Sequence, residues 1–182
     1  MKFSIQILLT IQFLTSSIVG IAQSDFVFFE TTNNTNVVCQ DKTLGVIANL
    51  LTIIEEGQNY QWLSDSVNIK KIKGEIAVVN TSTPGEKRLT FVLNISENHK
   101  LDTTIVINVL PKPVVDISYN SGELSFSANG DSEISSFKWV FNGSLETDFT
   151  DKVLKNPSAG TYRVLVFDGN GCSATSKEVV VK

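Results

Sequence analysis

The sequence repeats one order of features in its two halves, at an offset of about 75 residues. In the first half, Trp62 is followed by Pro84-Gly85, a long alternating segment and a final alternating segment. In the second half, Trp139 is followed by Ala159-Gly160 and two segments of the same kind. Such a repeat predicts one structural module used twice, so that the fold of one half constrains the fold of the other.

The long segments alternate apolar and other residues at every second position, which is the period of a half-buried β-strand and not of a helix. In one of these segments, Leu89, Phe91 and Leu93 share a face. Turn dipeptides such as Asn142-Gly143 and Asn170-Gly171 separate the segments. The chain is therefore predicted to be all-β.

Modules of this size with a Trp on a central strand predict an immunoglobulin-like β-sandwich, in which two sheets bury one face each and the Trp fills the space between them. We expect one such domain over residues 24–111 and a second over residues 112–182. Pro111-Lys112-Pro113 marks the connection, because its two prolines have no N–H to donate to a sheet. The aromatic residues expected in the cores are Trp62, Trp139 and Tyr162.

The second half also carries a family resemblance. Trp139 and the segment SAGTYRVLVFDGNGCSAT at residues 158–175 resemble the immunoglobulin-like repeats, of polycystic-kidney-disease type, in secreted and cell-surface proteins of Bacteroidota, including gliding-motility adhesin repeats. The segment TIVINVLPKP at residues 104–113 is similar to the way such repeats lead into the next one. The resemblance implies a sandwich fold, an envelope or extracellular location and an adhesive or spacer role, and it implies no catalytic residues.

The N-terminus predicts a secretory signal peptide over residues 1–22. Lys2 precedes an apolar run over residues 5–18, and Gly20 and Ala22 supply small residues before the expected cleavage site. Later segments are too short or too polar to cross a bilayer. We therefore expect an exported protein in the periplasm, at the cell surface or in the medium.

The two cysteines lie in different halves. Repeats of the type that the chain resembles often pair an early cysteine with one in a late turn, but Cys39 is the early residue of the first half and Cys172 the late residue of the second. Three alternatives follow. Both thiols are free and partly buried; or they pair across the two domains, which needs Cα atoms within about 7 Å and hence a folded-over arrangement; or they pair between molecules in head-to-tail chains.

Catalytic and metal-binding residues are scarce. His99 is the one histidine and is expected in an exposed turn, and no nucleophile elbow, phosphate loop or metal-spaced cluster is present. A net charge of −4 without basic runs argues against a nucleic-acid partner. We expect neither an enzyme nor a cofactor. Calcium is a weak alternative for the loops at residues 129–133 and 168–171 and for the loop that holds Asp148 and Asp151. Tight turns explain the Asn-Gly and Asp-Gly pairs of the first two loops better.

One face of the second domain is expected to carry three apolar side chains on adjacent strands, Val140, Leu165 and Phe167, where the first domain has polar residues. If exposed, they form a partner-binding patch; the alternative is that they pack on the first domain or on the connection.

The sequence thus predicts a secreted, non-catalytic binding or adhesion protein that presents a protein- or glycan-contacting surface on two modules. The alternatives are a structural spacer or envelope-assembly subunit, and an accessory carbohydrate-binding module with Trp62 or Trp139 stacked on sugars.

Overall fold

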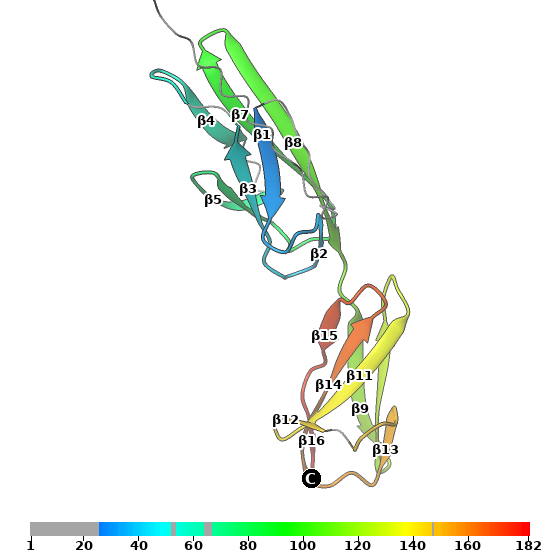
Figure 1. Cartoon of the computed structure of the whole chain (residues 1–182). Coiled ribbons are helices and arrows are strands. Elements are labelled where there is room, and N and C mark those ends of the chain that lie inside the picture. The colour runs from blue at the N-terminus through cyan, green and yellow to red at the C-terminus, as the bar shows by residue number, and fades with distance from the viewer. Residues whose placement is uncertain (1–25, 52–53, 64–66, 147) are drawn as a thin grey trace, which may run out of the picture.

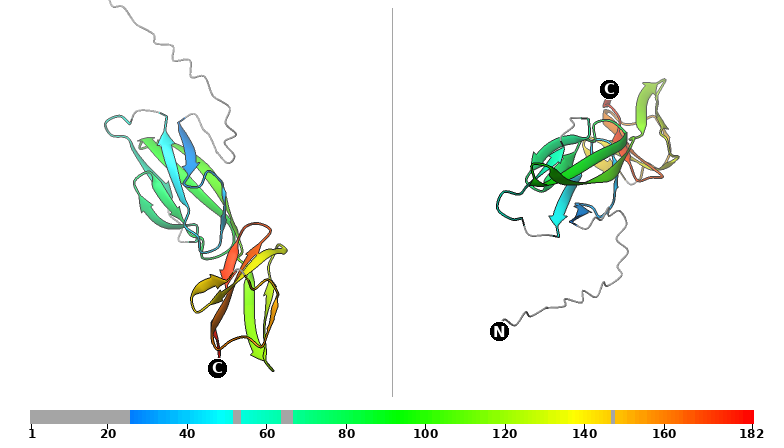
Figure 2. Two further views of the ribbon diagram at one scale, coloured as in Figure 1. Left: turned by 60° about the horizontal axis from the view of Figure 1, so that its bottom comes forward. Right: turned by 90° about the horizontal axis from the view of Figure 1, so that it is seen from above.

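The computed structural model describes residues 26–182, apart from residues 52–53, 64–66 and 147. The predicted signal peptide, residues 1–22, lies outside these described residues. Every helix or strand assigned within them is a β-strand, which confirms the predicted all-β class. The strands form two sandwiches that lie end to end (Figure 1, Figure 2), here named module one, residues 27–110, and module two, residues 114–181.

Module one consists of β1 (Val27–Thr31), β2 (Val37–Cys39), β3 (Gly45–Leu50), β4 (Asn59–Leu63), β5 (Ile69–Lys73), β6 (Ile76–Val79), β7 (Gly85–Ser96) and β8 (His99–Leu110). One sheet has the order β1-β3-β6-β5 and the other has the order β2-β8-β7-β4. The first sheet, together with β4, β7 and β8 of the second, reproduces the four-plus-three arrangement of immunoglobulin domains. The short strand β2 adds to the edge of β8 and runs parallel to it.

Module two consists of β9 (Val114–Asn120), β10 (Glu123–Asn129), β11 (Ile134–Phe141), β12 (Ser144–Glu146), β13 (Val153–Lys155), β14 (Gly160–Asp168), β15 (Ser173–Thr175) and β16 (Val179–Val181). The sheet β13-β10-β9 faces the sheet β12-β11-β14-β15, in which β16 also pairs with β14. Both modules are therefore immunoglobulin-like β-sandwiches.

The last strand of module two is interrupted. It consists of β15 and β16, which are separated by residues 176–178, and the Ser176 hydroxyl accepts the Val164 N–H at 3.0 Å. The Ser176 N–H in turn donates to the Val164 carbonyl at 2.9 Å. The serine side chain thus replaces a main-chain partner at the break, so that the buried N–H of Val164 is still satisfied.

Each module has its own aromatic core. In module one, Trp62 packs between Phe29 and Phe91, with ring centroids 5.5 and 5.2 Å away, and its indole N–H donates to the Glu75 carbonyl at 3.2 Å. In module two, Trp139 is fully buried and its indole N–H donates to the Asp151 carbonyl at 2.9 Å. Both tryptophans therefore fill the space between two sheets with their one polar group satisfied.

The two modules use different residues at the same corner. In module two, the buried Tyr162 hydroxyl donates to the Ser158 carbonyl at 3.0 Å, four residues upstream, in the manner of the tyrosine corner of immunoglobulin folds. At the matching place in module one stands Lys87, 3% exposed, whose ammonium donates to the Thr83 hydroxyl at 2.9 Å. Both modules thus hold this corner with a side-chain hydrogen bond to a residue four positions upstream, donated by a tyrosine in module two and by a lysine in module one.

In module one, a hydrogen bond joins Tyr60 on β4 to Glu75 in the turn between β5 and β6. The Tyr60 hydroxyl donates to the Glu75 carboxylate, and this bond lowers the pKa of Glu75. The same bond, helped by burial, raises the pKa of Tyr60. The stability supplied by the carboxylate is present above the ordinary pKa of Glu75, 4.5, and is lost as pH falls through the lowered value. The stability supplied by the phenol is present below pH 10.0 and is lost as pH rises through the raised value.

We therefore expect Tyr60→Phe to raise the pKa of Glu75 measured by NMR of its carboxyl carbon. The accompanying loss of stability is about 0.5 kcal/mol or less between pH 5 and 10, because the pair is largely exposed. An unchanged Glu75 pKa in the variant would mean that the bond does not persist in solution.

Candidate functional site

The base of module one is a tight turn after β2. Cys39 lies beside Leu110 in the parallel β2–β8 pairing. The Lys42 N–H donates to the Cys39 carbonyl at 3.1 Å, and Asp41, at φ 64°, donates its N–H to the Thr81 carbonyl at 3.0 Å. Aspartate tolerates this left-handed conformation better than most residues. The turn therefore fixes Cys39 next to the point where the chain leaves module one.

The top of module two is the turn between β14 and β15. The buried Asp168 carboxylate accepts the N–H groups of Asn170 at 3.0 Å and of Cys172 at 2.8 Å. This carboxylate therefore holds the turn and places Cys172, which is fully buried. No group of three or more His, Cys, Asp or Glu side chains suited to a metal ion occurs in the described part of the chain.

A disulfide joins the two modules. The Sγ atoms of Cys39 and Cys172 are 2.06 Å apart and the Cα atoms 5.4 Å apart, across 133 positions of sequence. Of the three alternatives that the sequence left open, the structure has the bond between the two domains. The expected folded-over arrangement is wrong. The modules lie end to end (Figure 1), because β2 ends at the base of module one and the turn before β15 projects from the facing end of module two.

An ion pair ties the connection to module one. The Lys112 ammonium lies 2.5 Å from the Asp41 carboxylate, and the two side chains are 44% and 50% exposed. An exposed pair of this kind contributes little to stability by itself. Its position matters more, because it restrains the Pro111-Lys112-Pro113 segment beside the disulfide.

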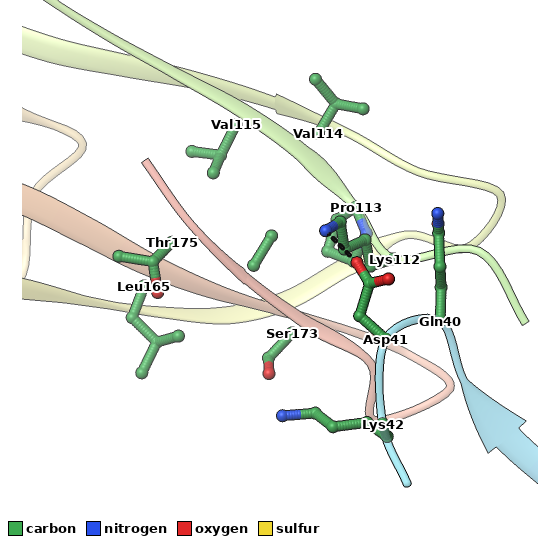
Figure 3. Close-up of a pocket in the computed structure, with 11 residues that line it drawn as sticks. Gln40, Asp41, Lys42, Lys112, Pro113, Val114, Val115, Leu165, Ser173 and Thr175 are labelled. Atoms are coloured by element: carbon green, nitrogen blue, oxygen red, sulfur yellow. Dashed lines mark hydrogen bonds and ion pairs between the residues drawn. The ribbon is translucent and has the colours of Figure 1, made fainter. Parts of the chain in front are cut away.

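A cavity of about 520 Å³ opens at this junction (Figure 3). Module one contributes Gln40, Asp41 and Lys42, the connection contributes Lys112 and Pro113, and module two contributes residues 114–115, 165 and 173–175. Figure 3 shows the Lys42 side chain extending toward Ser173, with the Asp41–Lys112 ion pair on the opposite side. The cavity thus has charged walls from module one and a mostly apolar or small-residue wall from module two.

The three residues of the expected patch lie on one face of module two and are half-buried. In the β11–β14 pairing, Val140 lies opposite Arg163, and Leu165 lies opposite Lys138. Leu165 also lines the junction cavity, so part of the patch turns toward the connection. Leu145, which periodicity did not indicate, is 58% exposed and lies opposite Val140 on β12. Val140, Leu145, Leu165 and Phe167 together form an outer patch on this face.

The other residues that the sequence singled out lie outside the junction and the outer patch. His99 is exposed where β8 begins. Trp62 and Trp139 lie in the two cores, and Tyr162 in the core of module two. No helix long and apolar enough to cross a membrane occurs within the described residues.

No family model and no curated protein matches the sequence. Among solved structures, the chain is similar to the insect immune protein hemolin, with 10% identity over 80% of this chain and 44% of that chain, at a TM-score of 0.43. It is also similar to the four N-terminal Ig domains of Dscam1, with 12% identity over 80% of this chain and 42% of that chain, at a TM-score of 0.33. The fibronectin(III)-like modules of Clostridium thermocellum CbhA match with 13% identity over 80% of this chain and 88% of theirs, at a TM-score of 0.34.

The chain therefore spans less than half the length of the hemolin and Dscam1 structures. At these identities the likeness concerns the fold alone.

Proposed function

We propose that this chain is an exported, non-catalytic binding protein that contacts a partner protein through the outer patch. Its immunoglobulin-like domains, residues 24–111 and 112–182, would be held in one arrangement by the junction. The observation that carries the proposal is the grouping of apolar side chains from β11, β12 and β14 on the face turned away from the core. A contiguous apolar surface with a polar rim is typical of a protein–protein contact.

A protein partner fits this surface better than a glycan. Sugar-binding surfaces commonly present exposed aromatic rings, but Trp62 and Trp139 are buried and make the hydrogen bonds of core residues. Among the large hydrophobic side chains exposed in the described residues, the one aromatic is Tyr119, on β9. The basic side chain Lys138 lies opposite Leu165, whereas Arg163, opposite Val140, is paired with Glu178 at 2.9 Å. The charge of Lys138 favours a partner with an acidic group beside an apolar surface.

Export is supported by the junction disulfide, because disulfides persist in oxidising compartments and are rare in the cytosol. The resemblance to Bacteroidota repeats of polycystic-kidney-disease and gliding-adhesin type supports the cell surface, the periplasm or the medium as the site of action. We therefore propose that the protein acts in one of these places in a bacterium of this group.

The test compares capture of partner proteins by the oxidised protein and by the variant Leu145→Asp/Phe167→Ser. These two positions belong to the outer patch and avoid Leu165, which also lines the junction cavity. Immobilised protein is exposed to the envelope fraction and medium of the source cells, and retained proteins are quantified by mass spectrometry. We expect a specific partner whose retention falls about tenfold or more in the variant, as for a contact-centre residue.

The control is Ile72→Ser, which removes an exposed apolar side chain from β5 of module one. It should retain the partner fully. Equal retention by the patch variant and the wild-type protein would rule out the outer patch as the contact.

A structural spacer is the second candidate, and the junction favours it. The disulfide and the Asp41–Lys112 ion pair hold the modules end to end. A spacer needs such a fixed arrangement, because it has to keep a constant distance between its two ends. Absence of any patch-dependent partner, together with an extended shape in solution, would favour the spacer over the binding protein.

A further inference from the structure

The outer edge of β15 is unpaired. β15 lies at the end of its sheet, and in the described residues β14 is the one strand that pairs with it, while β9 of the other sheet lies close to it. The Asp168 N–H donates to the Cys172 carbonyl, and the Ser176 N–H donates to the Val164 carbonyl, so even-numbered residues face β14. In an antiparallel ladder the residues between them point their N–H and C=O groups the other way. Ser173 and Thr175 therefore direct four main-chain groups away from the sheet.

The junction cavity lies along this edge. Ser173, Ala174 and Thr175 form one of its walls, and Val114, 64% exposed, belongs to the facing strand β9. The volume of about 520 Å³ is within the range of small-ligand sites and admits a few residues of extended chain. Figure 3 shows the side chains of Leu165, Ser173 and Thr175 together on one side, with Val114 and Val115 on the other.

A cation stands at the end of this groove. Lys42 lines the cavity and is exposed, and the three ion pairs within 4.0 Å found in the described residues do not include it. The neighbouring Lys112 is already neutralised by Asp41. The groove therefore offers main-chain hydrogen-bonding groups, apolar contacts and one unneutralised positive charge.

We infer that the junction groove binds an extended segment of another protein, which adds to β15 as an extra strand and places an acidic side chain against Lys42. Strand addition supplies affinity through main-chain hydrogen bonds, and pockets for alternate side chains supply specificity. The sandwich of module one already accepts a short strand at the edge of its last strand, where β2 pairs with β8. This site goes beyond the proposed function, because it does not depend on Leu145.

The disulfide assembles the site. Lys42 follows Cys39 by three residues and belongs to module one, whereas Ser173 follows Cys172 directly and belongs to module two. The cross-link therefore keeps the charge and the strand edge in one groove. Without it, β15 keeps its unpaired edge but loses its fixed distance from Lys42.

The experiment titrates the oxidised, ¹⁵N-labelled protein with short synthetic peptides that alternate valine with aspartate, or valine with lysine. We expect saturable amide shifts at residues 173–175 with the aspartate peptide. We also expect that peptide to bind about fivefold more tightly than the lysine peptide, the size of one exposed ion pair. Lys42→Glu should reverse the preference, and Cys39→Ser/Cys172→Ser should abolish it while leaving binding at β15.

Thr175→Pro tests the strand edge directly. It removes an N–H that the ladder does not use, a position where edge strands tolerate proline, so we expect a folded protein that has lost peptide binding; Thr175→Ser should retain it. If the proline variant unfolds, an N-methylated peptide removes main-chain donors from the ligand side instead.

No shifts at residues 173–175 with millimolar peptide, or full binding of the N-methylated peptide, would overturn the inference. Leu145→Asp should bind the peptides normally, because β12 lies at the opposite end of the sheet from β15, so a failure here is distinguishable from a failure of the outer patch.

Discussion

Replacement of both cysteines by serine, Cys39→Ser/Cys172→Ser, is expected to leave both sandwiches folded and to free their relative orientation. Each module has its own buried core, and the disulfide lies between the cores rather than inside either one. The modules would then be joined by the Pro111-Lys112-Pro113 connection, with the exposed Asp41–Lys112 ion pair beside it. Small-angle scattering should show a broader distribution of overall dimensions for the variant than for the oxidised protein.

The same variant should lower the free energy of unfolding of module two. While module one stays folded, Cys39 is held beside Leu110, so the cross-link closes a loop of about 60 residues in unfolded module two, worth at most about 4 kcal/mol by the chain-entropy model. Urea denaturation followed at the Trp139 indole signal reports this difference, with unfolding of module one followed at Trp62 as the internal reference.

Thiol counting and intact mass on the purified mature protein decide whether the bond forms in solution. We expect a monomer without free thiols. Two free thiols would contradict the junction described here, and disulfide-linked multimers on a non-reducing gel would point to pairing between molecules. The single variants are poor substitutes for the double variant, because each leaves one unpaired thiol that is free to cross-link other copies.

The architecture was accessible from the sequence because strand patterning is local. Alternation around Phe91 and around Val164 marks which side chains face a core, and each of these strands needs only its neighbours to bury that face. The interruption at Ser176 was not accessible, since it depends on a side chain reaching the Val164 N–H on another strand. A single serine between Thr175 and Lys177 carries no periodic signal.

The junction was accessible only as a set of alternatives. Cys39 and Cys172 are separated by 133 positions, and the sequence around them does not indicate the angle between the modules. The folded-over expectation rested only on the short Cα–Cα distance that a disulfide requires. Both lie instead at facing ends, Cys39 at the end of β2 and Cys172 in a turn fixed by Asp168.

The outer patch shows a similar limit. Its residues on β11 and β14 were identified because they alternate with core residues. Leu145 was missed because β12 has only three residues, too few to establish a period. The partnership of Leu165 with the connection depends on the end-to-end arrangement, which local patterning does not contain. The unpaired edge of β15 likewise becomes visible only when the sheet order is known.

Gly160→Ala is expected to destabilise module two strongly. Gly160 has φ 155°, and an added Cβ would lie 2.4 Å from Cε2 of Phe141 and 2.8 Å from the side-chain oxygen of Asn142. Neither group can move freely, because the Phe141 ring packs on Tyr162 at 4.8 Å and the Asn142 oxygen accepts the Thr161 N–H at 2.9 Å. Backbone strain and overpacking together suggest a loss of about 2 to 4 kcal/mol.

The matched control is Gly143→Ala, because Gly143 also has a positive φ, 86°, but an added Cβ there would meet no atom within 4 Å. This variant isolates the backbone strain, for which we expect a loss of about 1 to 2 kcal/mol. Urea denaturation of both variants, followed at Trp139, separates the two contributions. Equal losses would mean that Phe141 and Asn142 move aside at little cost, and the corner around Tyr162 would then be looser than its packing indicates. A larger loss for Gly160→Ala would instead establish that the glycine is required by the close approach of the Phe141 ring, and not only by its backbone angle.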